Sequence, residues 1–283
     1  MQIEVQAPNP HYLSAMADPA RTFLGGTLVQ RADHAPDLWT VRVRADEPIS
    51  YEPGQYVSLA LREGDRTIER PYSIVSAPRE PDLEFFFELV PHGELTPRLY
   101  ELRPGDRLLL RRRARGTFRL DRRSGRPHHF LVATVTGVAP YVSMLRQLAH
   151  EAEEGRPPAL QLTVIQGASR SWELGYREEL ESLAARHARW LRYVPAVSRP
   201  WDDAAWQGER GRCEDLVRKY LDLFRMEPGS TTAYLCGHPG MIDNATGILL
   251  RRGFAREDIR AELYWTPPGQ RRAIAARPGQ REA

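Results

Sequence analysis

RPYSIVSAP, at residues 70–78, places a cation, an aromatic ring and a hydroxyl group within four positions of a proline-bounded segment. Side chains alternate between the two faces of an extended chain, so Arg70 and Tyr72 share one face while Ser73 points to the other. We expect the backbone N–H of Ser73 to be available as a donor. This arrangement suits a flat ligand that also carries an anionic group. Taken alone, however, an arginine and a tyrosine on a strand are more often ordinary surface and core residues.

The chain on both sides of this stretch, from about residue 22 to 120, has apolar residues with a period of two. In LWTVRVRA (residues 38–45) apolar side chains alternate with polar or charged ones, and LEFFFELV and DRLLLRRR are similar. Turn signals such as EPG (52–54) and RPGD (103–106) separate these segments. Short alternating strands joined by turns predict an antiparallel barrel or sandwich.

The pattern changes after GRPHH, at residues 125–129. Short apolar strands now alternate with helical segments, because FLVAT leads to PYVSMLRQLAHEAE and LQLTVIQ leads to REELESLAARH. This order predicts an α/β domain with a parallel sheet and right-handed crossovers. Ligands of such sheets bind at the carboxyl ends of the strands. The loops TVTGVAP, GASR, VSRP and CGHP all follow strands, so we expect them to gather on one rim.

Composition excludes several classes of protein. The chain has 283 residues, of which 41% are hydrophobic and 27% charged, as in a globular protein of two domains. Its two cysteines, Cys213 and Cys236, are too few and too far apart for an iron–sulfur cluster, a zinc site or a disulfide framework. Any redox chemistry is therefore expected to use an organic cofactor and no metal. The net charge of +3 does not indicate nucleic-acid binding, and no apolar run reaches membrane-span length.

A flavin would satisfy the three residues of RPYS, with its phosphate on Arg70, its ring on Tyr72 and its N5 edge near Ser73. One strand downstream, GELTPRL sets Gly93 beside Thr96, which suits a pyrophosphate. The alternative is that Thr96 is simply the N-cap of a helix.

Two loops of the second half carry small residues. TVTGVAP (134–140) lets a backbone approach a dinucleotide closely, although it is not G-x-G-x-x-G and an ordinary turn is equally compatible. In CGHP, Cys236 could contact a nicotinamide and Gly237 admits a ring. A buried structural cysteine is the alternative.

Three arginines occupy loops after successive strands or a helix start: Arg170, Arg199 and Arg212. Together they could bind a 2′-phosphate and select NADPH over NADH. An arginine-rich chain places some arginines there by chance. The Ser–Arg pairing in both ASR and VSR favours the phosphate interpretation.

The order of these motifs resembles that of the ferredoxin–NADP reductase family over residues 22–265. RPYS matches the family's R-x-Y-S flavin motif, GELTPRL its pyrophosphate segment, and CGHP its C-G-x-P. TGVAP matches most of G-T-G-I-A-P, and ELYW (262–265) resembles the terminal E-x-Y-W of bacterial members. Two departures are the replacement of the first glycine of G-T-G-I-A-P by Val135 and the continuation of the chain past Trp265.

The resemblance implies an FAD-binding antiparallel β-barrel (22–125) followed by an NADP-binding α/β domain with a parallel sheet (126–265). An N-terminal extension (1–21) and a tail (266–283) flank them. The tail is rich in Pro, Gly, Arg and Ala without apolar periodicity, and we expect it to be flexible.

The resemblance also implies roles for individual residues. One group shapes the hydride-transfer site and relays a proton: Ser73, Cys236, Glu262 and Tyr264. The residues implied to bind FAD phosphates, the flavin ring or the adenine are Arg70, Pro71, Tyr72, Ser73, Gly93, Leu95, Thr96, Tyr264 and Trp265. Those implied to bind NADP(H) are Thr136, Gly137, Arg170, Ser198, Arg199, Arg212 and Gly237.

The function implied by the resemblance is that of an FAD-dependent ferredoxin/flavodoxin–NADP(+) reductase. It would move a hydride between NADPH and the flavin, and single electrons to or from an acidic carrier, ferredoxin or flavodoxin. Two alternatives stay open: the reductase component of an oxygenase system, and a flavin-bound electron-transfer or sensor subunit without NADPH turnover. We expect a cytoplasmic monomer or homodimer that binds neither nucleic acid nor membrane.

Overall fold

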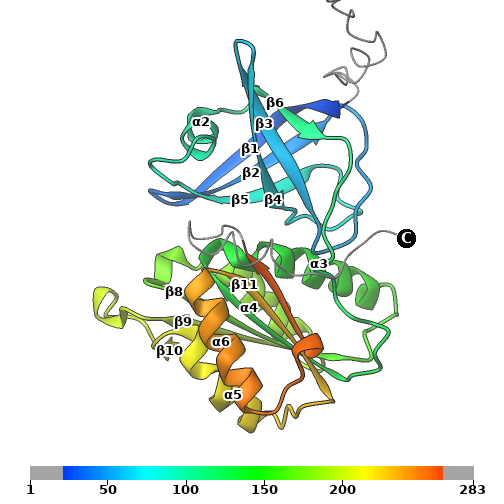
Figure 1. The fold of residues 1–283 in the computed structure, drawn as a ribbon, viewed down its shortest axis with the longest axis vertical. Helices are drawn as coiled ribbons and strands as arrows, with labels where there is room; N and C mark the ends of the chain where they lie inside the picture. Colours follow the sequence, from blue (N-terminus) through cyan, green and yellow to red (C-terminus); the bar gives the residue numbers. More distant parts are fainter. Residues whose placement is uncertain (1–21, 264–283) are drawn as a thin grey trace, which may run out of the picture.

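The computed structural model describes residues 22–263, and its two halves are stacked one above the other (Figure 1). The N-terminal extension (1–21), Tyr264, Trp265 and the tail (266–283) lie outside the described residues. What the sequence suggests for them therefore stays a prediction.

The first half is a six-stranded antiparallel sheet with the strand order β4-β3-β6-β1-β2-β5. Its strands are β1 (Phe23–Ala35), β2 (Leu38–Ala45), β3 (Tyr56–Glu63), β4 (Arg66–Ser73), β5 (Leu83–Glu88) and β6 (Arg107–Arg111). A short helix, α2 (Thr96–Glu101), lies between β5 and β6. Just beyond β4, the N–H of Val75 donates to the carbonyl of Glu84 at 2.8 Å, which brings the two edge strands together. The sheet is therefore a barrel, as the period of two predicts.

Strand β5 shows why one part of this barrel departs from simple alternation. Phe85 and Phe87 point into the barrel core, whereas Phe86 packs into a core shared with the second half. Because both faces of β5 are covered, its sequence LEFFFE is almost continuously apolar. The same shared core includes Leu38 of β2, so this side of the barrel forms the interface between the halves.

The second half is a six-stranded parallel sheet with the order β10-β9-β8-β7-β11-β12. Its strands are β7 (His128–Thr134), β8 (Gln161–Ala168), β9 (Leu191–Val197), β10 (Glu209–Arg210), β11 (Thr231–Gly237) and β12 (Ile259–Leu263). The helices are α3 (Ala139–Glu153), α4 (Arg177–Arg186), α5 (Val217–Leu223) and α6 (Pro239–Arg251). The predicted α/β architecture with a parallel sheet is confirmed.

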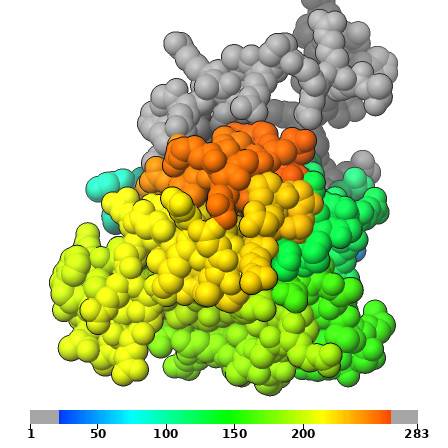
Figure 2. Space-filling view, turned by 90° about the horizontal axis from the view of Figure 1, so that it is seen from below, coloured from blue at the N-terminus to red at the C-terminus, as the bar shows by residue number. Residues whose placement is uncertain are grey.

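Helices cover both faces of this sheet. Residues of α3 and α4 pack on one face and residues of α5 and α6 on the other. Seen from below, the second half hides nearly all of the barrel (Figure 2). The barrel therefore faces the ends of the parallel strands that lie away from this viewpoint. These are the carboxyl ends, which the loops after β7, β8, β9 and β11 follow (Figure 1). In the part of the chain from 22 to 263, no helix is both long and apolar enough to cross a membrane.

Candidate functional site

Strand β4 carries the RPYS motif, and its exposed end presents two guanidinium groups. Arg70 and Arg66 both form ion pairs with the carboxylate of Glu94, which belongs to the GELTPRL segment. Hydrogen bonds from Arg70 and Arg66 lower the pKa of Glu94. Arg66 was not among the residues predicted from the sequence, although its spacing of four from Arg70 on a strand places both side chains on the same face. The structure therefore brings two cations and one carboxylate together where a phosphate was predicted.

Tyr72 lies further along β4 and is half-buried. Its ring meets that of Phe87 edge-on, with the ring centroids 4.8 Å apart. Burial raises the pKa of the Tyr72 hydroxyl, which is therefore neutral at physiological pH. Pro71, beside it, is exposed. A neutral aromatic ring anchored at one edge can stack on a flat ligand.

The other end of β4 meets the parallel sheet. Ser73 is only 6% exposed, and its hydroxyl donates to Oε1 of Glu262 at 3.3 Å. Glu262 on β12 is the register partner of Cys236 on β11, and Cys236 is fully buried. The site thus combines residues from three strands and from both halves: Ser73 of β4, Glu262 of β12 and Cys236 of β11. Burial raises the pKa of Glu262 to about 7, against the opposing effect of the hydrogen bond from Ser73.

The GELTPRL segment forms a tight turn before α2. The N–H of Gly93 donates to the Val90 carbonyl at 2.8 Å, and a Cβ on Gly93 would lie 3.1 Å from Thr96 Oγ1. Thr96 Oγ1 accepts the Val90 N–H at 3.1 Å. The alternative interpretation of Thr96 as an N-cap is wrong, because the N-cap position is held by buried Leu95 and Thr96 is the first helical residue. The hydroxyl stabilises the turn that carries Glu94.

The loops after β7 and β11 are in direct contact. A Cβ on Gly137 would lie 2.3 Å from the Cys236 carbonyl oxygen, so only glycine fits there. Gly237 has a φ of 125°, and the next residue donates its N–H to Thr134 Oγ1 at 2.8 Å. Thr136 lies in the 3₁₀ turn Val135–Val138, directly before α3. The predicted nucleotide loop is thus packed against the CGHP loop, beside Cys236.

Val135 has a φ of 43°, in the left-handed region that β-branched residues avoid. The family motif has glycine at this position, and the backbone keeps a conformation that glycine adopts more easily. Val135 therefore holds a β-branched side chain in a backbone conformation that favours glycine.

The three arginines of the rim are held differently. Arg170 pairs with Asp202 at 2.8 Å and with Glu173 at 3.2 Å. Arg199 is exposed, and Arg212 is 71% exposed with a carboxylate 3.8 Å away.

The backbone brings two of these arginine loops together. The N–H of Arg199 donates to the Ser169 carbonyl at 2.9 Å, and that of Ser198 donates to the Ala168 carbonyl at 3.0 Å. The loops after β8 and β9 therefore run side by side. Asp202, which neutralises part of this cluster, was not identified from the sequence.

The donor set fits the ligands expected from the sequence. Exposed guanidinium groups at one end of β4 suit a diphosphate, and Tyr72 suits a flat ring. The part-buried Ser73–Glu262 pair marks where the ring edge would meet the parallel sheet. Within residues 22–263 no group of three or more His, Cys, Asp or Glu residues is arranged to hold a metal ion.

Comparisons with known proteins identify both halves. A family model described as an oxidoreductase FAD-binding domain matches residues 26–119, and one described as an oxidoreductase NAD-binding domain matches residues 131–246. The phenol 2-monooxygenase reductase component of Pseudomonas sp. (strain CF600) is 32% identical over 259 residues, covering 88% of this chain and 69% of that protein. The flavodoxin/ferredoxin–NADP reductase of Escherichia coli (strain K12) is 30% identical over 200 residues, covering 69% of this chain and 77% of that protein.

A solved structure shares the whole two-half arrangement. It is a ferredoxin NADP⁺ reductase from Neisseria gonorrhoeae with bound FAD and NADP, with a TM-score of 0.75 and 26% identity. The match covers 86% of this chain and 99% of that one. Since the two family models follow the order of the barrel and the parallel sheet, the chain is an FAD- and NAD(P)-binding oxidoreductase that belongs to the ferredoxin–NADP reductase family.

Proposed function

We propose that the protein oxidises NADPH through a bound FAD and exchanges single electrons with a ferredoxin or flavodoxin, in either direction. The observation that carries this proposal is the contact between Ser73 of the flavin motif and Glu262 at the carboxyl edge of the parallel sheet. It puts a half-buried proton carrier at the junction where a flavin and a nicotinamide would meet. The name of the Escherichia coli relative supports the choice of carriers.

On the flavin side, we assign phosphate binding to Arg70, with Arg66 as a second cation. Both guanidinium groups must exchange Glu94 for phosphate oxygens. Tyr72 would stack on the ring, and the Gly93–Thr96 turn would hold the segment that carries Glu94 next to the phosphates. The positions predicted for Tyr264 and Trp265 lie outside the described residues and stay predictions.

On the nucleotide side, we assign the close approach of a diphosphate to Thr136 and Gly137, and the 2′-phosphate to Arg199 and Arg212. Both arginines are exposed on the rim, so they are accessible to a ligand from solvent. Arg170 can join them only when its ion pairs with Asp202 and Glu173 open.

FAD, when bound, supplies the conversion between a two-electron hydride and single electrons. The protein's part is positioning and proton management. Because its pKa lies near 7, Glu262 can both hold and release a proton at its carboxyl oxygen at neutral pH. Ser73 Oγ, 3.3 Å away, is within reach for that exchange. Cys236 is the register partner of Glu262 on the neighbouring strand β11, so we assign it to the same part of the site.

We also propose that residues 22–125 form the FAD-binding domain and residues 126–265 the NADP-binding domain, with Tyr264 and Trp265 of the second predicted to contact FAD as well. A cytoplasmic location and a monomeric or homodimeric state stay predictions from the sequence.

A second candidate is the reductase component of an oxygenase system, which would use the same two halves and a different electron acceptor. The 32% identity to the phenol 2-monooxygenase reductase component is consistent with it. The two candidates share the NADPH–flavin step and differ only in what accepts the electrons.

The first test is an anaerobic stopped-flow experiment in which the FAD-loaded protein is mixed with one equivalent of NADPH or NADH. We expect rapid bleaching of the oxidised flavin spectrum, faster with NADPH. Flavin that stays oxidised would refute the proposal and favour a binding or sensor subunit.

The acceptor is then tested separately. The reduced protein is mixed with a [2Fe–2S] ferredoxin, with a flavodoxin, or with a multicomponent oxygenase and its substrate. Rapid electron transfer to ferredoxin or flavodoxin in the absence of an oxygenase supports the first candidate. Transfer only to the oxygenase assembly would favour the second.

A further inference from the structure

Helix α3 connects the two binding regions. It begins at Ala139, immediately after the 3₁₀ turn Val135–Val138 that contains the nucleotide loop. About one turn along is Ser143 and about two turns along is Arg146; they are three residues apart and therefore lie on one face of the helix. Both side chains reach across the interface and bind the barrel.

Ser143 holds the segment that follows the flavin motif. Its hydroxyl is fully buried and donates to the carbonyl of Ser76 at 2.7 Å. Ser76 belongs to RPYSIVSAP and lies three residues beyond Ser73. The Tyr51 hydroxyl donates to the same carbonyl at 3.0 Å, and Ser76 Oγ accepts the N–H of Glu84 at 3.1 Å. The end of the flavin strand is thus tied to α3 by a buried hydrogen bond.

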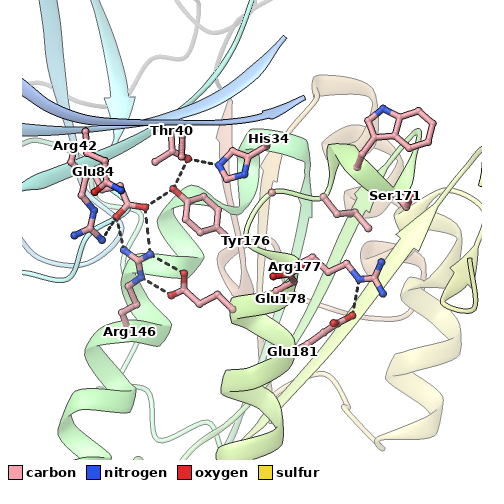
Figure 3. A pocket seen from close by; sticks show the side chains of 16 residues that line it. His34, Thr40, Arg42, Glu84, Arg146, Ser171, Tyr176, Arg177, Glu178 and Glu181 are labelled. Atoms are coloured by element: carbon pink, nitrogen blue, oxygen red, sulfur yellow. Dashed lines mark hydrogen bonds and ion pairs between the residues drawn. The ribbon is translucent and has the colours of Figure 1, made fainter. Parts of the chain in front are cut away.

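Arg146 makes the second connection, which Figure 3 shows. Its guanidinium lies 3.0 Å from a carboxylate oxygen of Glu84 on β5. On its other side it binds both carboxylate oxygens of Glu179 on α4, at 2.6 and 2.8 Å. Arg146 is only 13% exposed. A single cation therefore joins the barrel, α3 and α4.

Glu84 gathers the remaining contacts. It is 3% exposed and accepts hydrogen bonds from the Tyr176 hydroxyl at 2.7 Å, while Arg42 pairs with it at 2.7 Å (Figure 3). Burial pushes the pKa of Glu84 up, but Arg146, Tyr176 and Arg42 together outweigh burial and hold it below its ordinary value. Glu84 is therefore ionised, and loss of its charge removes one of the carboxylates that the largely buried Arg146 pairs with.

Tyr176 occupies this network at a cost in backbone conformation. It caps α4 with a φ of 64°, which is unfavourable for a residue with a Cβ. Its ring packs edge-on against Phe86 of the barrel, and its hydroxyl also lies 3.1 Å from Thr40. Strained backbone persists where surrounding contacts over-determine it, and here the contacts with Phe86, Thr40 and Glu84 cross the interface.

Apolar packing also joins the two halves, but it is non-directional and does not by itself fix their relative orientation. Hydrogen bonds and bidentate ion pairs have defined geometry. Hydride transfer requires reacting atoms at roughly 3–3.5 Å, and here the two cofactors are held by different halves. Residues that fix the orientation of the halves therefore fix that distance.

We propose that Ser76, Glu84, Ser143, Arg146 and Tyr176 form a domain clamp that positions the nucleotide loop relative to the flavin strand and so sets the rate of hydride transfer. The clamp residues are positioning residues and act through the elements that bind the cofactors. This inference rests on the proposed NADPH–flavin reaction.

The test compares Glu84→Gln, Ser143→Ala and a matched control, Glu154→Gln. Glu154, at the end of α3, pairs with Arg79 of the barrel, but both side chains are exposed. The control thus removes an interface ion pair between the same two regions without touching the clamp. Ser143→Ala removes one hydroxyl and is the milder variant if Glu84→Gln folds poorly.

The kinetic measurement is the limiting rate of flavin reduction at saturating NADPH, per bound FAD. We expect Glu84→Gln to lower this limiting rate about 10–100-fold, since a displacement of the reacting groups near 1 Å can slow a reaction by about 100-fold. Ser143→Ala should lower the rate by less. The dissociation constants of FAD and NADP⁺ should change little, and Glu154→Gln should match the wild type. A clamp variant that loses FAD affinity but reduces its remaining flavin at the wild-type rate would overturn the proposal.

A second measurement does not depend on turnover. Nitroxide labels at Arg62→Cys on the barrel and Leu223→Cys on α5, both exposed, report the distance between the halves by pulsed electron paramagnetic resonance. We expect a narrow distribution that broadens or shifts in Glu84→Gln and Ser143→Ala but not in Glu154→Gln. An unchanged distribution in both clamp variants refutes the clamp. If the wild type is not reduced by NADPH, the proposed function fails, and this measurement still decides whether the clamp orients the halves.

Discussion

The flavin region on β4 and the nucleotide region on the rim of the parallel sheet differ in how their polar groups are held. In the flavin region, Arg70 and Ser73 lie on opposite faces of the single strand β4. The strand ends at Ser73, which is buried and contacts Glu262. In the nucleotide region, Arg199 and Arg212 come from separate loops and are exposed to solvent. Exposed charges are screened by salt and contribute modestly, whereas buried groups interact strongly.

This difference matches the two kinds of ligand. A cofactor that stays bound through many turnovers suits a preformed, partly buried strand. A substrate that must leave after each turnover suits exposed side chains on loops. The comparison predicts large effects for substitutions at the buried junction and smaller, coenzyme-specific effects on the rim.

The largest effect is expected at the junction, from Glu262→Gln. The pKa of Glu262 is raised from 4.5 to about 7, so its protonated form is the one that stabilises the fold. That stabilisation is complete below pH 4.5 and is lost as the pH rises through about 7. Glutamine is neutral throughout. The free energy of unfolding of the variant relative to wild type should therefore rise by up to about 3 kcal/mol between pH 4.5 and 8.

Urea unfolding across this pH range measures the difference, and oxidation of the reduced flavin by ferredoxin is followed in parallel, because hydride transfer itself moves no separate proton. We expect the variant to be more stable at pH 8 yet about 100-fold slower in the proton-coupled step, because the glutamine cannot exchange a proton. A stability difference that does not depend on pH would show that Glu262 titrates normally.

The next largest effect is expected at the exposed end of β4. Charge-assisted hydrogen bonds to phosphate contribute about 1.5–3 kcal/mol, so Arg70→Ala should weaken FAD binding about 10–100-fold. Arg66→Ala should weaken it less, and Glu94→Gln should strengthen it by removing the competing carboxylate. Flavin fluorescence titration at low and high salt measures these constants. Arg62→Ala is the control, an exposed arginine on the neighbouring strand, and an equal loss there would indicate a non-specific charge effect.

The contrast between the regions also explains what the sequence could predict. The period of two gave the barrel strands, and RPYS placed Arg70, Tyr72 and Ser73 correctly along β4 because alternation on a strand is a local property. The alternation of strands and helices gave the parallel sheet and its rim. These features depend on neighbours in the chain.

The features that the sequence did not reveal depend on contacts between distant segments. Glu94 neutralises Arg66 and Arg70 only because the turn before α2 folds beside β4. Asp202 engages Arg170 only because the loops after β8 and β9 run side by side. Interpreting Thr96 as an N-cap failed because its hydroxyl bonds to the backbone six residues earlier, at Val90. The clamp around Glu84 likewise joins four elements that no local pattern connects.

A moderate effect is expected on the rim, from Arg199→Ala. If Arg199 binds the 2′-phosphate, kcat/KM with NADPH should fall about tenfold while kcat/KM with NADH changes little. Asp202→Asn should raise kcat/KM with NADPH, because it releases Arg170 from a carboxylate 2.8 Å away. Steady-state kinetics with both coenzymes give the ratio. Arg189→Ala, an exposed arginine before β9, is the control. Equal losses with NADPH and NADH in Arg199→Ala would remove the 2′-phosphate assignment.

The smallest effect is expected at Val135, where two substitutions separate conformation from bulk. Alanine keeps the Cβ and its left-handed strain at φ 43°, whereas glycine removes both. A Cβ in this region costs roughly 1–2 kcal/mol, and the greater freedom of glycine in the unfolded chain offsets about half of the gain. Val135→Gly should therefore be about 0.5–1 kcal/mol more stable than Val135→Ala in urea unfolding. Val135→Gly should also bind NADP⁺ more tightly than Val135→Ala or the wild type, because the backbone can approach a phosphate more closely. An alanine variant as stable as the glycine variant would mean that the loop relaxes, and that Val135 affects the nucleotide region through its side chain alone.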